Sequence, residues 1–367
     1  MTAQTNLQPK KRLVSLDVLR GITVFVMIIV NNGAGPVHFQ MLDHSKWNGL
    51  TVCDLVFPFF LFMVGVSIPF AMKSKASQPP AKRYGSILWR TFKLFAVGVL
   101  LHAWDMFVWG DTPILPNLRL WGVLQRIAIC YCICTLLVMW VNPKHIWKIA
   151  CSLLIIYAIM LTVGNGYAQD NTNLAAIIDR LYLSEAHLYH KSPIDPEGLM
   201  GTISALAHTL IGVMVGRAIS DKNIEIDKRI LNLFLFSTVL GIIGYLISFE
   251  YPLNKRIWSP SYTLVTCSMA TSILALLTYI IDVKGQNKWC SLFRFFGLHA
   301  FTLYILSEAL APISGYINAP ETIHDILAQF LDPRIASLIY ALLFDATVGV
   351  IGFIYIKTLN KFNIDKK

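Results

Sequence analysis

Four polar side chains between residues 31 and 54 have the types and spacing of a proton-transfer site. His44 is followed ten residues later by Asp54, and Asn31 and Asn48 lie in the same stretch. A neutral imidazole that is oriented by a carboxylate is a competent general base near neutral pH. On its own, His44 would indicate only a histidine with an ordinary hydrogen bond, but the cluster favours catalysis. His38 is a rival base, with no carboxylate at a suggestive spacing.

A second group of charges lies close to the N-terminus. Asp17 and Arg20 are one helical turn apart and can form an ion pair on the same helix face. Such a pair lowers the cost of burying both charges and would orient the helix. Alternatively, Arg20 contacts a phosphate, for which a guanidinium is well suited. The sequence leaves both interpretations open.

The composition places these residues in a membrane protein. Hydrophobic residues make up 55% of the 367 residues, charged residues make up 14%, and the mean hydropathy is +0.58. A soluble domain is about a quarter charged. The apolar residues form ten runs of about 20 residues, which is the length that crosses a hydrocarbon core. The runs cover residues 13–32, 51–72, 86–104, 121–140, 146–164, 199–219, 230–249, 261–281, 294–313 and 335–357.

All ten runs are expected to be helices, so we predict an all-α, polytopic membrane bundle of about ten transmembrane helices. Backbone groups in lipid must form hydrogen bonds within their own segment, and the short alternating segments of barrel strands do not occur in the sequence. We expect a single transmembrane domain over residues 13–357, with tails at 1–12 and 358–367. The long connection 165–198 is either a substrate-facing wall or a solvated cap.

Basic residues predict the orientation of this bundle. With the N-terminus in the cytoplasm, twenty lysines and arginines fall in inside segments and seven in outside segments. This bias follows the positive-inside rule and places both termini and both tails in the cytoplasm. It also accounts for the net charge of +10 without nucleic-acid binding, which would need a basic soluble face.

Other patterns favour structural roles. The histidines form no pair at the i, i+4 spacing of helical metal ligands, so we expect no metal site. Cys130, Cys132 and Cys134 have the wrong spacing for zinc and favour apolar packing. Gly212 and Gly216 permit close helix approach, either inside the bundle, which is the preferred interpretation, or at a dimer face.

Five blocks of sequence together resemble the lysosomal heparan-α-glucosaminide N-acetyltransferase family and its bacterial relatives. They are RLVSLDVLRG (12–21), HSKWNGLTVCD (44–54), GVLQR (122–126), PEGLMGT (196–202) and PLNKRIWSPSY (252–262). The resemblance runs from about residue 12 to residue 357. The block with tryptophan, asparagine and glycine is highly specific, whereas the first block is shared more widely among membrane acyltransferases.

The resemblance implies an enzyme that moves the acetyl group of cytosolic acetyl-CoA, its cosubstrate, across the membrane to the amine of a terminal glucosamine. It assigns the active-site histidine to His44 and two further catalytic positions to Asp54 and Asn31. We expect the acceptor sugar to be bound by Trp47, Asn48, Glu197, Asn254 and Trp258. We expect acetyl-CoA to be bound by Arg20, Arg90, Lys93 and Arg126.

The resemblance also shapes the expected setting of the protein. We expect a multi-pass protein of a bacterial inner membrane, and a homodimer is suggested by the family alone. We expect this protein to lack the family's long N-terminal luminal domain. A small amino sugar or a cell-surface glycan is therefore a more plausible acceptor than heparan.

Two chemical schemes and two other functions stay open at this point. His44 either deprotonates the acceptor amine for direct attack, the preferred scheme, or carries the acetyl group itself. Asp54 would orient the imidazole, and Asn31 or Asn48 would stabilise the oxyanion. The alternative function is an amino-sugar transporter with the same fold, motivated by the intramembrane charges Arg126, Glu308 and Asp345. A purely structural membrane protein would leave the polar cluster around His44 unexplained.

Overall fold

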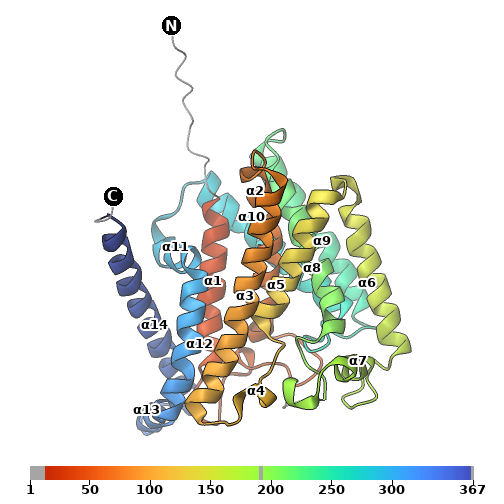
Figure 1. The fold of residues 1–367 in the computed structure, drawn as a ribbon. Helices are drawn as coiled ribbons and strands as arrows, with labels where there is room; N and C mark the ends of the chain where they lie inside the picture. Colours follow the sequence, from red (N-terminus) through yellow and green to blue (C-terminus); the bar gives the residue numbers. More distant parts are fainter. Residues whose placement is uncertain (1–12, 190–192, 365–367) are drawn as a thin grey trace.

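The computed structural model describes residues 13–189 and 193–364, which form a bundle of helices (Figure 1). No strand occurs in these two ranges, so the prediction of an all-α fold is confirmed. The predicted tail at 1–12 lies outside the described residues. The other predicted tail, 358–367, is partly described, and helix α14 continues through it to Ile364.

Nine helices in the described part of the chain are long and apolar enough to cross a membrane. These are α1 (Val14–Asn31), α2 (Val52–Ser74), α3 (Pro80–Trp109), α5 (Val123–Trp140), α6 (Ile146–Val163), α8 (Leu199–Ser220), α9 (Ile226–Ile247), α10 (Pro260–Leu277) and α14 (Pro333–Ile364). A tenth span results when α11 (Ser291–Leu298) and α12 (Ala300–Tyr316), which meet at a bend of 69°, are counted together. Each of the ten predicted runs therefore contains helix, and the ninth is broken.

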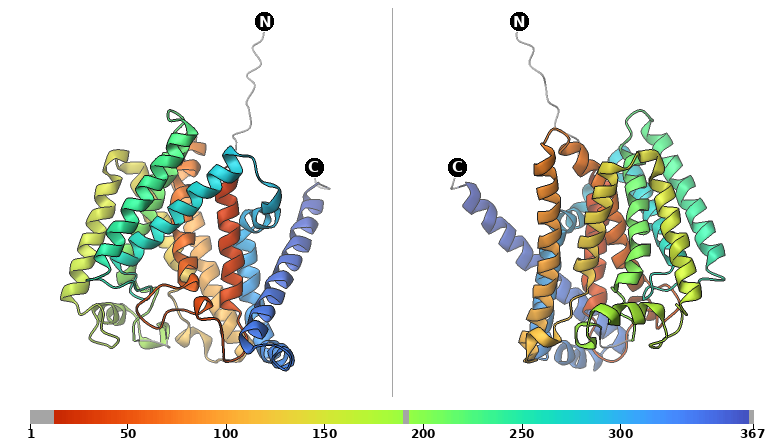
Figure 2. Two further views of the ribbon diagram at one scale, coloured as in Figure 1. Left: turned by 180° about the vertical axis from the view of Figure 1, so that it is seen from behind. Right: turned by 45° about the vertical axis from the view of Figure 1, so that its right-hand side comes forward.

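The ends of the described chain and the short helices lie at opposite ends of the bundle. The beginning of α1 and the end of α14 lie at the same end in every view, which we call the inner end (Figures 1 and 2). The short helices α4 (Ile114–Asn117), α7 (Leu174–Tyr182) and α13 (Ala319–Ala328) lie at the opposite, outer end. Because the beginning of α1 and the end of α14 lie on the same side, the bundle agrees with an even number of spans. That the inner end faces the cytoplasm stays a prediction from the positive-inside bias.

Helices α2 and α8 cross with almost no space between their backbones. A Cβ on Gly212 would lie 2.3 Å from the carbonyl oxygen of Phe62, and one on Gly216 would lie 2.3 Å from that of Val66. Gly65 faces them from α2, and a Cβ there would lie 2.1 Å from the carbonyl oxygen of Thr209. Small residues allow this approach in a membrane, where packing rather than the hydrophobic effect holds helices together. The preferred interpretation of the glycine pair as internal packing is confirmed.

The break in the ninth run coincides with a second close crossing. Gly297, near the end of α11, faces α1, and a Cβ there would lie 1.7 Å from the carbonyl oxygen of Asp17. On α1, a Cβ added to Gly21 would likewise lie 1.7 Å from the carbonyl oxygen of Phe293. The chain then bends at His299 before α12 begins. A straight helix could not both touch α1 in this way and follow α12 to the outer end.

Burial separates the interior helices from those facing lipid. The most apolar window of α8 is 78% buried within the bundle, and those of α1 and α2 are each 61% buried. The corresponding window of α3 is only 6% buried, and its exposed side chains include Trp89, Phe92 and Leu100. Such an apolar surface suits contact with lipid.

The connection 165–198 folds onto the outer end. Asn173 caps α7 by accepting a hydrogen bond from the backbone N–H of Ala175 at 2.8 Å. Asp179, at the end of α7, accepts hydrogen bonds from the Tyr182 hydroxyl at 2.8 Å and from the backbone N–H of Leu199 at 3.0 Å. Because Leu199 is the first residue of α8, this carboxylate joins the connection to the start of a central helix.

The α2–α8 crossing yields a stability prediction. Gly212→Ala places a methyl group against the backbone of Phe62, so we expect a lower melting temperature in detergent, corresponding to a loss of about 1–3 kcal/mol. Gly85→Ala on α3 is the matched control, because nothing lies within 4 Å of its added Cβ. The control should leave the melting temperature unchanged or raise it. Equal effects of the two substitutions would contradict the close crossing.

Candidate active site

The side chain of Asp54 is held at the start of α2 by the cap of that helix. Its Oδ2 accepts hydrogen bonds from the backbone N–H groups of Thr51 at 3.2 Å and Ser45 at 3.1 Å. The Thr51 hydroxyl accepts in return from the Asp54 N–H at 3.3 Å, which completes a capping box. Asp54 is fully buried. The cap therefore fixes one carboxylate oxygen and leaves the other for a partner.

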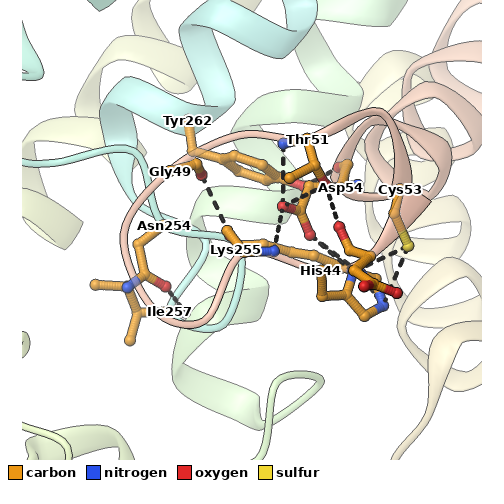
Figure 3. A network of polar contacts seen from close by, with 11 residues as sticks. His44, Gly49, Thr51, Cys53, Asp54, Asn254, Lys255, Ile257 and Tyr262 are labelled. Carbon is orange, nitrogen blue, oxygen red and sulfur yellow. Dashed lines mark hydrogen bonds and ion pairs between the residues drawn. The ribbon is translucent and has the colours of Figure 1, made fainter. Parts of the chain in front are cut away.

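That partner is His44. Its Nδ1 lies 2.8 Å from Oδ1 of Asp54, and its side chain is 52% exposed (Figure 3). With the proton on Nδ1 donated to Asp54, Nε2 carries the lone pair and can accept a proton. The structure thus brings together the two residues that the sequence singled out as an oriented base. His38, for which no carboxylate partner was expected, does have one in Asp43 at 3.0 Å. That expectation was wrong.

Two further side chains contact the imidazole of His44 and were not predicted. Nζ of Lys255 lies 3.1 Å from Nδ1 and 3.2 Å from Nε2, and 3.9 Å from Oδ1 of Asp54 (Figure 3). Sγ of Cys53 lies 3.2 Å from Nδ1 and 3.6 Å from Nε2. Lys255 is 211 positions from His44, so no local spacing could reveal the contact. Its only signal was its place in the block 252–262.

The loop of Lys255 is tied to the loop of His44. The backbone N–H of Gly49 donates to the carbonyl oxygen of Leu253 at 2.7 Å, and Nδ2 of Asn254 donates to Oδ1 of Asn48 at 3.1 Å. Oδ1 of Asn254 accepts in turn from the backbone N–H of Ile257 at 3.2 Å. Asn48 and Asn254, predicted to bind sugar, therefore join two loops around the site.

The two tryptophans that were predicted to bind sugar pack against other side chains of the protein. Trp258 is fully buried, with its ring 4.9 Å from that of Phe57 and 5.3 Å from that of Tyr262. Its φ of 54° is a left-handed conformation that a bulky residue adopts only when packing enforces it. Trp47 packs against an apolar cluster around Tyr157. Trp258 thus packs against Phe57, which lines the cavity described below.

A second charged cluster stands at the outer end. Arg119 donates at 2.7 Å to both Asp195 and Glu197, and its guanidinium lies 4.7 Å from the ring of Tyr189. Burial opposes ionisation of Glu197, but the cations Arg119, Arg126 and Lys255 outweigh it, so the pKa of Glu197 is below its ordinary value. Arg119 was not predicted, because an isolated arginine before an apolar run reads as an interfacial anchor.

One cavity of about 810 Å³ connects these groups. At the outer end it is lined by His44, Asp54, Lys255, Arg119 and Glu197. Apolar side chains line its middle, among them Met27, Phe57, Phe60, Met63, Val64 and Leu94. Arg20, Ser67, Arg90 and Lys93 line it farther toward the inner end. Asn31 and Glu308 also line the cavity and lie beside each other.

The predicted acetyl-CoA cations divide into two sets. Arg20 pairs with Asp17 at 3.1 Å and also donates to Ser67 at 3.2 Å, while its side chain keeps a face on the cavity. Arg90 lies over the ring of Tyr131 at 4.4 Å. Arg126 is elsewhere: it is buried near the start of α5, donates to the carbonyl oxygen of Gly198 at 2.8 Å and lies 5.1 Å from the ring of Trp258. The cavity therefore brings together Arg20, Arg90 and Lys93 without Arg126.

Known proteins resemble the chain over most of its length. A sequence model of the catalytic region of heparan-alpha-glucosaminide N-acetyltransferase matches residues 12–245. The heparan-alpha-glucosaminide N-acetyltransferase of Mus musculus is 28% identical over 369 residues, which cover 84% of this chain and 55% of the relative. That of Homo sapiens is 28% identical over 359 residues, which cover 81% and 53%. The chain thus spans about half the length of the curated relatives it matches.

The charged cluster at the outer end predicts a pH-dependent contribution to stability. A carboxylate with a lowered pKa stabilises the fold above its ordinary pKa, and the contribution is lost as the pH falls through the lowered value. We expect Glu197→Gln to lower the melting temperature at pH 7, and the difference from wild type to shrink below about pH 4. Glu185→Gln is the control, because its pair with Arg180 is 75% exposed on the glutamate side. A difference independent of pH would refute the ionic contribution.

Proposed function

The chain belongs to the heparan-α-glucosaminide N-acetyltransferase family, and on this premise we propose that it is a transmembrane acetyltransferase. It takes the acetyl group of acetyl-CoA from the cytoplasmic side and transfers it to the amine of a glucosamine-type sugar at the outer face. The observation that supports this most is the single cavity, with cations toward one end and the His44–Asp54 pair at the other.

The inner part of the cavity suits the donor. The guanidinium of Arg20 and the charges of Arg90 and Lys93 supply donors for the phosphates of acetyl-CoA. Ser67, which contacts Arg20, and Asp54 are thirteen residues apart on α2, and thus roughly 20 Å apart along its axis. A long, extended donor is needed to cover that distance. The apolar walls between them suit the pantetheine arm.

The outer part of the cavity suits the chemistry. His44 Nε2 takes a proton from the acceptor amine as the nitrogen attacks the carbonyl carbon of the thioester. The C–S bond then breaks, and the thiolate of CoA receives that proton from the imidazolium. Asp54 holds the ring in one orientation and stabilises the imidazolium. We prefer this direct transfer to an acetyl-histidine intermediate, because it asks His44 only to move a proton.

In this proposal the acceptor sugar binds at the outer end of the cavity. Tyr189 and Glu197 line it and come from the connection 165–198, so this connection supplies part of the wall. The Glu197 carboxylate can accept hydrogen bonds from sugar hydroxyls, and the Tyr189 ring can cover an apolar sugar face. Trp47, Asn48, Asn254 and Trp258 serve as the frame that holds these walls, in place of direct sugar contacts. Arg126 supports Gly198, at the base of the same wall.

Transport of an amino sugar is the second candidate, since the cavity extends between polar groups near both ends of the bundle. The two functions make opposite demands on acetyl-CoA and on His44. A transporter moves sugar without acetyl-CoA and tolerates loss of the imidazole.

A bacterial inner-membrane location, cytoplasmic termini and a homodimer remain part of the acetyltransferase proposal.

Transfer of labelled acetyl from acetyl-CoA to glucosamine, by the purified protein in lipid, tests the proposal. We expect His44→Ala to lower the rate by about 10²–10⁴-fold, with acetyl-CoA binding retained. His38→Ala is the matched control, because it removes a histidine paired with an aspartate in the same loop but outside the cavity wall. It should keep the wild-type rate.

Three outcomes would change the conclusion. Sugar uptake by wild type without acetyl-CoA, together with no transfer to any amino sugar, would favour transport. Full activity in His44→Ala would mean that the protein is an acetyltransferase but that His44 is not its base. Acetyl trapped on His44 in a rapid burst would replace direct transfer by the covalent scheme.

A further inference from the structure

Lys255 is a cation held against the proposed base. Its Nζ lies within 3.2 Å of both ring nitrogens of His44, although its side chain is only 17% exposed. It lines the cavity together with His44 and Asp54. In Figure 3 its side chain extends from the loop of Asn254 toward the His44–Asp54 pair. Its Nζ also lies 3.9 Å from Oδ1 of Asp54, the oxygen that His44 contacts.

The backbone that carries Lys255 is held in a turn by hydrogen bonds. Its carbonyl oxygen accepts a hydrogen bond from the N–H of Trp258 at 3.1 Å, and the N–H of Ser259 donates to the carbonyl oxygen of Asn254 at 3.0 Å. The ties between Gly49 and Leu253 and between Asn48 and Asn254 then fix this turn relative to His44. Donors that act on a transition state must be in place before the reaction, and this turn meets that requirement.

The other polar groups at the site have different partners. Oδ1 of Asn48 is engaged by Asn254, and Asn31 lies beside Glu308. The guanidinium of Arg119 is shared between Asp195 and Glu197. Of the cations in the described residues that line the cavity, Lys255 is the one recorded in contact with His44. The predicted oxyanion role of Asn31 or Asn48 is thus better filled by Lys255.

We propose that Lys255 is a catalytic residue that stabilises the oxyanion formed on the acetyl carbonyl, an inference that rests on the acetyltransferase function. As the acceptor nitrogen bonds to the carbonyl carbon, the C=O π electrons move to oxygen, and the proton of the amine moves to Nε2 of His44. The ammonium of Lys255 donates a hydrogen bond to this oxyanion. When the C=O bond re-forms, the C–S bond breaks and the thiolate takes the proton from His44. Lys255 ends with the protons it began with.

The test compares steady-state kinetics of Lys255→Met, which keeps the length of the stem, with those of Lys255→Arg, which keeps a cation. We expect Lys255→Met to lower kcat about 100-fold, as the loss of one oxyanion donor does, with little change in KM for either substrate. Lys255→Arg should recover a substantial part of kcat. Lys46→Met is the matched control, because Lys46 is exposed on the same loop as His44 and lies outside the cavity wall. It should match wild type.

A mass measurement of the wild-type protein tests the same proposal without any variant. Nζ of Lys255 lies 3.2 Å from Nε2 of His44, so a lysine that acted as a nucleophile instead of an oxyanion donor would itself be acetylated. Incubation with acetyl-CoA alone should leave the peptide containing Lys255 unmodified. Acetylation of Lys255 would overturn the proposal, as would a wild-type kcat in Lys255→Met or a loss confined to KM. If wild type transfers acetyl to no amino sugar, the proposed function fails, and this role fails with it.

Discussion

The carboxylate of Asp54 is the group on which the site depends. A buried carboxylate in a membrane protein is costly unless its lone pairs are satisfied. Here one oxygen accepts two backbone N–H groups at the start of α2, and the other accepts from His44. The helix needs the cap, and the cap needs the carboxylate, so the position of the imidazole is set by the same contacts that begin the helix. Stability of the helix start and orientation of the His44 imidazole are therefore inseparable at this residue.

The same logic explains why the recognisable blocks of this sequence are far apart along the chain. The block 44–54 supplies the proposed base and the cap, and the block 252–262 supplies Lys255 and the turn that holds it. The hydroxyl of Tyr262 joins them directly, because it donates at 2.6 Å to the backbone carbonyl oxygen of Asp54. The block 196–202 adds Glu197 and the carbonyl oxygen that Arg126, from block 122–126, contacts. No single block therefore supplies all of the residues that meet here.

The fold could be predicted from the sequence because the membrane imposes a simple rule. Spans must be about 20 apolar residues long and helical, so hydropathy alone located all ten. The bend between α11 and α12 could not be predicted, since it depends on how closely Gly297 approaches α1. At the site, His44 and Asp54 were found because both lie in one short stretch. Lys255 and Arg119 were missed because their partners are 211 and at least 76 positions away.

The proposed division of roles among these residues follows from access to the cavity. Trp258, Arg126 and Asn254 are almost completely buried and bind other parts of the protein, whereas His44, Lys255 and Glu197 line the cavity. Resemblance marks both kinds of residue equally, since a substitution that displaces the frame also displaces the groups it holds. What separates them is access to the cavity, a property of three-dimensional packing. The proposed chemistry at the outer end therefore rests on few side chains, and the buried residues that hold them set their distances.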